Sequence, residues 1–516
     1  MQGTKFFYEN GTQFYMKGIA YQQDSAAKGQ TNTNKTDYID PLSDEDLCKK
    51  DVPLLEELGI NTIRTYAIDP EADHSGCMKL LDDAGIYVIS DLSQPALSIV
   101  RNNPTWNVPL YNRYKAVVDE LAQYPNVIGF FAGNEVSDAS NNTEASAYVK
   151  AALRDTKKFI KDQKYDHPLG VGYASNDHPD IREEIAQYFN CGPDEEATDY
   201  WGYNIYSWCQ ESTMQRSGYN DQIKFFENYN VPVFFAEYGC NEPDGAEGRI
   251  FQETAALYND EMTKVFSGGL VYMYHQEEND YGVVEYKNGE PKRMKNFQKL
   301  KEQHAKADPK RVDESDYSAS GDRETCPEIG DVWRASSNLP PTPDEDLCDC
   351  MVAASSCVAT DDLDVKDFGD IFDDICGQPG NLCAGISGNA TTGVYGAYHG
   401  CSDRAKLAHI LDVYYQAQNE AFDACDFDGA ATTQEPSAAS SCDDALASAS
   451  SINEEAATAT SPLDNASSTG GSGSGSGNDE GAAFTSTPIS RISLGNFAVG
   501  LYMVVAMGVG ALMVAL

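Results

Sequence analysis

The chain has 516 residues and is strongly acidic, with 81 Asp and Glu against 37 Lys and Arg and a formal net charge of −44. This length exceeds one ordinary hydrophobic core, so we expect two or more domains. The negative charge opposes binding to nucleic acid or to anionic membrane surfaces, and it suits a neutral partner such as a polysaccharide.

The N-terminal part alternates strand and helix signals. Amphipathic helices are expected at Asp44–Leu58, Leu110–Gln123 and Ala145–Lys161, and Pro53 leaves open whether the first is one helix or two. Eight β-units separated by helices over ~300 residues predict a (β/α)₈ barrel of the α/β class. A doubly wound sheet is the alternative, but no Gly-rich nucleotide loop follows Gly18. The expected strands are Phe14–Gln22, Asn61–Ile68, Ile86–Leu92, Val127–Asn134, Leu169–Ser175, Tyr200–Ser207, Val231–Tyr238 and Leu270–Gln276.

Two of the apolar strands each end in a glutamate. The run from Val127 leads into Asn134-Glu135, and the run from Val231 leads into Glu237. Two buried strands that each deliver one carboxylate at the C-terminal end provide the pair that a glycosidase needs. The alternative is that each glutamate only caps its strand and is solvated.

The other C-terminal strand ends are polar and aromatic, unlike the strands that precede them. In a barrel the functional residues gather at these ends. Sugars are bound by such residues, because carboxylates and amides contact the hydroxyls and aromatic rings contact the ring faces. Ordinary packing with a satisfied hydroxyl is the alternative for any single tyrosine. The candidates are Tyr21, Gln22, Tyr66, Asp91, Asn134, Asn176, Asp177, Tyr206 and Tyr274.

A cysteine-rich segment follows the barrel rhythm, which ends near Asp313. We assign residues 1–335 to a catalytic domain, 336–343 to a linker and 344–444 to a small disulfide-stapled module. The even total of 14 cysteines indicates disulfides and an oxidising compartment. A zinc site is disfavoured because Cys348-Asp-Cys350 is not a C-x-x-C pair and lacks a nearby histidine pair. Sequons that also fit secretion stand at Asn10, Asn34, Asn141, Asn389 and Asn465.

The C-terminal end predicts a lipid anchor. Residues 445–481 are rich in Ser, Ala and Gly and read as a disordered stalk. Residues 482–516 have the pattern of a GPI signal, with Gly481 as the ω site, a polar spacer and the apolar tail Phe497–Leu516. A tail-anchored helix is the alternative. No signal peptide follows Met1, so we expect a chain cut at a domain start or a gene model without its first exon.

Six motifs stand in order along the chain: Lys17-Gly-Ile-Ala-Tyr-Gln22, Asn61-Thr-Ile-Arg-Thr-Tyr66, Gly133-Asn-Glu-Val136, Gly202-Tyr-Asn-Ile-Tyr206, Phe235-Ala-Glu-Tyr-Gly-Cys240 and Tyr272-Met-Tyr-His-Gln-Glu-Glu278. With them the chain resembles the fungal cell-wall β-1,3-glucanosyltransferases of glycoside hydrolase family 72, the Gas/Gel/Phr group. The resemblance covers nearly all of the chain, including the cysteine-rich module, which is similar to a family 43 carbohydrate-binding module.

The resemblance implies roles for these residues. Glu135 is the expected acid/base and Glu237 the expected nucleophile, and the other strand-end candidates named above are expected to hold the donor glucan. It also implies a protein secreted to the outer face of the plasma membrane and the cell wall, held there by a GPI lipid. The implied disulfides are Cys48–Cys77, Cys191–Cys326, Cys209–Cys240, Cys348–Cys401, Cys350–Cys442, Cys357–Cys425 and Cys376–Cys383.

The expected reaction is retaining transglycosylation of β-1,3-glucan, with no cofactor and no metal. Glu237 must be ionised and Glu135 protonated, so their environments must differ, and Tyr206 is placed to donate to Glu237. We expect the two carboxyls to lie roughly 5–5.5 Å apart. A hydrolytic endo-β-1,3-glucanase would share the same residues, because water would only replace the acceptor sugar. A non-catalytic wall glucan-binding protein would keep the aromatic cleft but would not need both glutamates.

Overall fold

Eight parallel strands close into a barrel in the computed structural model, which describes residues 1–23, 38–319 and 321–459. Their order around the barrel follows the sequence, and the last strand pairs with the first. This closure confirms the (β/α)₈ prediction and excludes an open doubly wound sheet. The barrel strands are β3 (Met16–Ala20), β4 (Thr62–Thr65), β5 (Tyr87–Asp91), β6 (Val127–Asn134), β7 (Gly170–Ser175), β8 (Trp201–Ile205), β9 (Val233–Tyr238) and β10 (Phe266–Val271).

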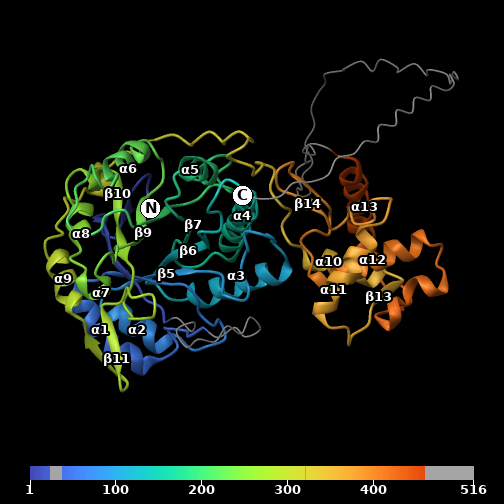
Figure 1. The fold of residues 1–516 in the computed structure, drawn as a ribbon, viewed down its shortest axis with the longest axis horizontal. Helices are drawn as coiled ribbons and strands as arrows, with labels where there is room; N and C mark the ends of the chain where they lie inside the picture. The colour runs from blue at the N-terminus through green and yellow to red at the C-terminus, as the bar shows by residue number, and fades with distance from the viewer. Residues whose placement is uncertain (24–37, 320, 460–516) are drawn as a thin grey trace, which may run out of the picture. The chain divides into compact units, whose positions relative to one another are not determined.

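Helices surround these strands (Figure 1). The three expected helices are present, and Pro53 does not divide the first of them. Asp44 caps that helix by accepting a hydrogen bond from the backbone NH of Leu47. The helices of the barrel part are α1 (Glu45–Leu58), α2 (Ser75–Asp83), α3 (Val108–Leu121), α4 (Ala145–Gln163), α5 (Arg182–Asn190), α6 (Tyr219–Phe226), α7 (Gly245–Gly248), α8 (Gln252–Leu257) and α9 (Lys295–His304), with the 3₁₀ turns η2 (Met262–Lys264) and η3 (Glu314–Asp316).

The predicted strand Leu270–Gln276 is placed about four residues too late, since β10 begins at Phe266. Two glycines, Gly268 and Gly269, interrupt the apolar pattern, so the sequence did not show where this strand begins. A Cβ at Gly268 would lie 2.1 Å from the carbonyl oxygen of Met16, and one at Gly269 would lie 2.9 Å from Cβ of Phe235. Close approach to both neighbouring strands therefore requires glycine here.

An apolar cluster fills the barrel beneath the polar strand ends. Met16, Ile89, Phe131, Phe234 and Leu270 come from five different strands and all are buried in this one cluster. The interior of the barrel is therefore filled with apolar side chains, and the functional groups lie at the C-terminal ends of the strands. Short antiparallel pairs lie outside the barrel: β1 (Phe6–Phe7) with β2 (Gln13–Phe14), and β11 (Val284–Lys287) with β12 (Glu290–Arg293).

The cysteine-rich segment forms a small helical module with its own apolar cluster, which includes Phe368, Ile375, Leu407 and Ile410. Its elements are α10 (Glu345–Ala354), β13 (Cys357–Ala359), η4 (Val365–Asp367), α11 (Phe368–Cys376), β14 (Gly388–Asn389), β15 (Val394–Tyr395), α12 (Asp403–Ala417), η5 (Phe422–Cys425), η6 (Phe427–Gly429), β16 (Ala431–Thr433), η7 (Ser440–Cys442) and α13 (Asp443–Thr458).

All fourteen cysteines are paired, and the pairs are those that the family resemblance implied. Three disulfides lie in the barrel part and four in the module. A short segment has little core of its own, so these cross-links supply much of the module's stability. The pairs are Cys48–Cys77, Cys191–Cys326, Cys209–Cys240, Cys348–Cys401, Cys350–Cys442, Cys357–Cys425 and Cys376–Cys383.

The predicted disordered stalk begins too early at residue 445, because residues 443–458 form helix α13. Its Ala-rich sequence favours a helix, and the Cys350–Cys442 disulfide ties its start to α10. Ala449 is buried in a cluster with Cys348 and Met351, and Asn453 accepts a hydrogen bond from the backbone NH of Ala397 at 2.8 Å. The module therefore extends to about residue 458.

Several expectations fall outside the described residues: the sequons at Asn34 and Asn465, the remainder of the stalk, the ω site Gly481 and the tail Phe497–Leu516. The sequons at Asn10, Asn141 and Asn389 are described, and all three asparagines are exposed. Within the described ranges, none of the helices combines the length and the apolar character that a membrane crossing requires.

Candidate active site

A buried arginine joins the side chains of three barrel strands. Arg64 of β4 has no exposed surface, and its Nε and Nη2 each donate to one oxygen of Asp91 at 2.9 Å. Nη1 donates to Oε1 of Glu237 at 3.2 Å, and Nη2 also donates to Oδ1 of Asn134 at 3.0 Å. A guanidinium with two parallel bonds to a carboxylate has little rotational freedom. Arg64 therefore fixes the relative positions of Asp91, Asn134 and Glu237.

Glu237, the penultimate residue of β9, is surrounded by hydrogen-bond donors. Besides Arg64, the hydroxyl of Tyr66 donates to its Oε1 at 2.7 Å and the hydroxyl of Tyr206 donates to its Oε2 at 2.8 Å. Burial raises the pKa of Glu237, and these donors, which stabilise the ionised form, oppose that rise. The predicted hydrogen bond from Tyr206 is thus present, and the carboxylate is held in one orientation from both oxygens.

Glu135 directly follows β6 and has a left-handed backbone, with φ of 49°. Hydrogen bonds fix this unusual conformation on both sides. Its NH donates to the carbonyl of Ala174 at 2.8 Å, and its carbonyl accepts from Nη2 of Arg101 at 2.7 Å. The left-handed turn costs free energy in a non-glycine residue, so the surrounding contacts must hold it. It ends the strand and directs the Glu135 side chain toward the cleft.

Asn204 of β8 binds both Glu135 and the preceding residue, Asn134. Its Nδ2 donates to Oδ1 of Asn134 at 3.0 Å and to Oε1 of Glu135 at 2.9 Å. With Oε1 of Glu135 accepting this bond, its other oxygen is left for contacts in the cleft. In the register of the sheet, Asn204 lies opposite Glu237. The same small set of polar side chains therefore positions both carboxylates.

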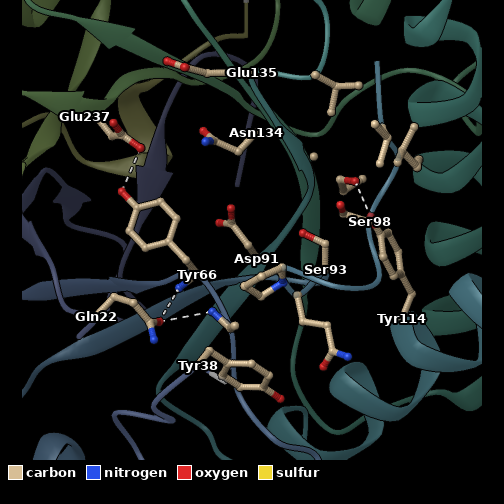
Figure 2. A pocket seen from close by; sticks show the side chains of 18 of the residues that line it. Gln22, Tyr38, Tyr66, Asp91, Ser93, Ser98, Tyr114, Asn134, Glu135 and Glu237 are labelled. Carbon is tan, nitrogen blue, oxygen red and sulfur yellow. Dashed lines mark hydrogen bonds between the residues drawn. The ribbon is translucent and has the colours of Figure 1, made fainter. Parts of the chain in front are cut away.

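One cavity of about 650 Å³ is lined by Tyr66, Asp91, Asn134, Glu135 and Glu237, and its size suits a small ligand or a few sugar units. Arg64, Asn204 and Tyr206 are not part of its described lining. Figure 2 shows Glu135 at the top and Glu237 to its lower left, with Asn134 below Glu135, Asp91 below Asn134, and Tyr66 below Glu237. Of the predicted cleft residues, Gln22, Tyr66, Asp91 and Asn134 contribute to the lining. Further lining residues that the strand-end reading did not propose include Tyr38, Ser98, Arg101, Tyr114 and Tyr272.

Tyr21 and Tyr274 do not lie in the cleft, which corrects our prediction for both. Only 1% of Tyr21 and 0% of Tyr274 is exposed. Both hydroxyls instead donate to the buried carboxylate of Asp51 on α1. A sugar cannot reach these rings. The strand-end position suggested the cleft for both, but each ring turns to the outside of the barrel, toward α1.

The remaining predicted residues have local partners. Asn176 donates to the carbonyl of Ser137 at 2.9 Å, and Asp177 accepts from Arg182 at 2.7 Å and from the hydroxyl of Tyr203. Neither contributes to the lining of the cavity in the described part of the chain. Their predicted contact with glucan therefore stays a prediction.

Sequence reasoning missed two positioning residues, Arg64 and Asn204. Both stand in quoted motifs, Asn61–Tyr66 and Gly202–Tyr206, and both are polar residues inside fully buried barrel strands. A charge at such a position requires a partner, because its desolvation is otherwise too costly. That signal could have identified Arg64, although it could not have named Asp91, Asn134 and Glu237 as its partners.

The arrangement suits acid–base and nucleophilic chemistry on one bond. Glu237 is rigid, donor-stabilised and almost fully buried, as a carboxylate that attacks a carbon centre requires. Glu135 is half-buried and keeps one carboxyl oxygen beyond the bond to Asn204. A carboxyl with access to the cavity can give and take a proton there. Two carboxyls in these roles define a retaining glycosidase-type site.

Comparison with protein families gives two matches along the chain. Residues 1–308 match the model of the family described as glucanosyltransferase, and residues 355–432 match the X8 domain. A 1,3-beta-glucanosyltransferase of Arthroderma benhamiae is 49% identical over 99% of this chain and 92% of its own. The 1,3-beta-glucanosyltransferase GAS2 of Saccharomyces cerevisiae is 42% identical over 80% of this chain and 75% of its own.

Solved structures give the same relationship. A structure of a Saccharomyces cerevisiae Gas2p mutant in complex with laminaritetraose and laminaripentaose is similar with a TM-score of 0.77 and 39% identity, over 87% of this chain and 97% of that one. Gas2p in complex with laminaripentaose is similar with a TM-score of 0.76 and 40% identity, over 84% and 96%. The similarity thus extends from the barrel into the cysteine-rich module.

Proposed function

The chain belongs to the glucanosyltransferase family, and from that premise we propose how its own residues carry out the transfer. It is a 1,3-beta-glucanosyltransferase, which cleaves a β-1,3-glucan and joins the new reducing end to the non-reducing end of another. We assign the nucleophile to Glu237 and the acid/base to Glu135. The observation that carries this assignment is that both carboxyls open into one cavity, where only Glu237 is enclosed by an arginine and two tyrosine hydroxyls.

In the first step a bond forms between Glu237 and the anomeric carbon of the donor. The glycosidic bond breaks as Glu135 gives its proton to the leaving oxygen, and the reducing-end fragment departs. Arg64 and the hydroxyls of Tyr66 and Tyr206 hold the attacking carboxylate in place. Asn134 is positioned to bind the sugar 2-hydroxyl, a contact that strengthens in the transition state.

In the second step the 3-hydroxyl at the non-reducing end of an acceptor glucan attacks the same carbon. Glu135, now ionised, accepts the hydroxyl proton, and the bond to Glu237 breaks to release the carboxylate. The two inversions give a new β-1,3 bond. Water in place of the acceptor would give hydrolysis, so the outcome depends on how well the acceptor excludes water from the cleft.

Product sizing from one purified laminari-oligosaccharide tests the transfer. We expect products both shorter and longer than the substrate, because each cleaved donor is joined to an intact acceptor. The measurement is chromatographic sizing or mass spectrometry of early time points, with a Glu237→Gln variant as the blank. A wild-type enzyme that yields only products shorter than the substrate would be an endoglucanase and would contradict the transfer.

We propose that the module binds glucan while the barrel performs the chemistry. Support comes from the X8 match and from a chain division into residues 1–335, the linker 336–343 and a module from 344. The module ends at about residue 458 and not at 444, because α13 packs on α10 through Ala449 and Met351. The module would thus bind glucan without contributing residues to the catalytic site.

We further propose that the protein acts at the outer face of the plasma membrane and in the cell wall, held by a GPI lipid. The support is the sequence pattern alone: the small residue Gly481, the polar spacer and the apolar tail Phe497–Leu516. After cleavage near Gly481 the mature chain would keep a stalk whose sequence is rich in Ser, Ala and Gly. Such a stalk would let the barrel reach glucan away from the bilayer.

Phospholipase release tests this anchor. The full chain, expressed in a fungal cell with a secretion signal, should leave isolated membranes when they are treated with phosphatidylinositol-specific phospholipase C. Mass spectrometry of the released protein should find no peptide from Phe497–Leu516. Retention on the membrane with those residues still attached would identify a tail-anchored helix instead.

A further inference from the structure

A buried carboxylate outside the cavity accepts hydrogen bonds from three tyrosines. Asp51 of α1 has no exposed surface. The hydroxyl of Tyr21 donates to its Oδ2 at 2.8 Å, while those of Tyr274 and Tyr286 donate to its Oδ1 at 2.7 Å and 2.6 Å. Three hydroxyls that converge on one carboxylate form a network rather than an isolated contact.

In the described part of the chain no Lys or Arg side chain forms an ion pair with Asp51, although the charge of Lys50 helps to lower its pKa and that lysine pairs with Glu290 instead. The ring of His275 lies 4.0 Å from Oδ2 of Asp51, and burial lowers the pKa of His275 to about 3, which leaves it neutral. Burial also raises the pKa of Asp51, and the three hydroxyls oppose that rise. A buried carboxylate of this kind is costly, and apolar packing would stabilise a helix–barrel contact at least as well. Its presence therefore calls for a role beyond core stability.

Two of the three tyrosines adjoin residues that line the cavity. Tyr21 directly precedes Gln22, whose Oε1 accepts hydrogen bonds from the backbone NH groups of Tyr66 and Ala67 at 3.0 and 3.1 Å (Figure 2). Tyr66 in turn donates to the nucleophile Glu237. The chain from Asp51 to Glu237 thus runs through contacts of 3.0 Å or less.

Tyr274 stands at the other side of the same carboxylate. It directly follows Tyr272 and Met273, which both line the cavity. Its backbone NH donates to the carbonyl of Ala20 at 2.9 Å, so the segments after β3 and β10 are neighbours that share Asp51. The helix that carries Asp51 is itself anchored, because the Cys48–Cys77 disulfide joins it to α2. Asp51 therefore links two cleft segments to a rigid outer helix.

We propose that Asp51 is a positioning residue for glucan binding: through Tyr21 and Tyr274 it holds the two segments that carry Gln22, Tyr272 and Met273. This inference rests on the proposed function of the cavity. Asp51 does not touch substrate in this role. It fixes the positions of these two segments of the cleft wall. Loss of Asp51 therefore weakens the binding of the sugar chain more than it slows the chemical step.

Single-hydroxyl variants test the proposal with a control built into the network. Tyr286 donates to the same Oδ1 as Tyr274, but its strand β11 contributes no residue to the described lining of the cavity. Tyr21→Phe, Tyr274→Phe and Tyr286→Phe each remove one hydroxyl from the carboxylate. All three should lower Tm to a similar extent, since each loses one hydrogen bond to a charged group.

Binding should separate the variants. We expect Kd for laminaripentaose to rise about tenfold for Tyr21→Phe and for Tyr274→Phe, and to stay within about twofold for Tyr286→Phe. Asp51→Asn, which keeps one acceptor oxygen, should weaken binding at least as much as the stronger single variant. Equal Kd values across the three tyrosine variants, or an unchanged Kd in Asp51→Asn, would reduce Asp51 to a structural residue and overturn the proposal.

The measurement uses calorimetric titration of the full chain in a Glu237→Gln background, where substrate is not consumed. This choice separates the two hypotheses. If the proposed transfer fails in the product assay but the cavity still binds laminaripentaose, the ranking of the variants still decides the role of Asp51. In the active enzyme the same ranking should appear in KM, with kcat changed less than KM.

Discussion

Replacing Glu237 with glutamine should abolish turnover, with a loss on the order of 10⁴-fold or more in kcat, because no other group takes over a covalent nucleophile. Glutamine keeps the shape of the side chain but cannot attack the anomeric carbon. It also removes the negative charge that Arg64 contacts at 3.2 Å. The rate is measured with a purified laminari-oligosaccharide by product sizing.

A matched control for this substitution is Glu253→Gln. Glu253 of α8 is also almost fully buried, and burial raises its pKa to about 7, but it does not line the described cavity. Its glutamine variant should keep kcat within about threefold of the wild type, since surface and core changes away from the chemistry act on stability instead. Comparable losses in both variants would mean that misfolding, not chemistry, explains the first.

Azide distinguishes the nucleophile from the acid/base. A Glu237→Gly variant given an activated laminaribiosyl donor and sodium azide should form a glycosyl azide of inverted configuration, because azide enters the space that the carboxylate leaves. The product is identified by the proton coupling of its anomeric centre. A retained product from the Glu237 variant would show that we have exchanged the two roles.

Replacing Glu135 with glutamine should lower kcat on a natural glucan by about 10²–10⁴-fold, the usual contribution of a general acid. The loss depends on the leaving group. A donor with an acidic leaving group, such as dinitrophenyl β-laminaribioside, leaves without protonation. The first step of the reaction with this donor should therefore be nearly unaffected. The covalent intermediate should then accumulate, since Glu135 is absent as the base for the second step.

Burst kinetics and mass spectrometry of the quenched Glu135→Gln enzyme measure that intermediate. A mass increase equal to the transferred sugar, located on the peptide with Glu237, is the expected result. Glu253→Gln serves as the control here too, because Glu253 is a buried carboxyl that is not part of the described lining of the cavity. Equal loss on natural and activated donors would show that Glu135 is not the acid.

Local sequence alone determined the catalytic strands and their carboxylates. The strand Val127–Asn134 has the predicted bounds, because an apolar run ending in two polar residues describes a strand that leaves a core at a cleft. Apolar residues at helical spacing also predicted the helix of Asp44–Leu58, while the structure decided that Pro53 does not divide it. Glu135 and Glu237 were predicted as catalytic residues because the active site of a barrel lies at the C-terminal ends of its strands.

Long-range contacts decided what local sequence could not. Tyr21 directly follows its strand as Tyr66 does, and Tyr274 lies shortly after β10, yet Tyr21 and Tyr274 donate to Asp51 on α1. No local pattern gives the direction of a ring relative to a distant helix. The start of β10 at Phe266 depends on how closely Met16 and Phe235 approach two glycines.

The pairing of Arg64 with Asp91 and Glu237 shows the same division between local and tertiary information. The residues are 27 and 173 positions apart in the chain, and only closure of the barrel brings them together. A sequence shows that a buried charge needs a partner, because desolvation is costly. Which partner it meets depends on the register of neighbouring strands, and that register is fixed by packing over the whole barrel.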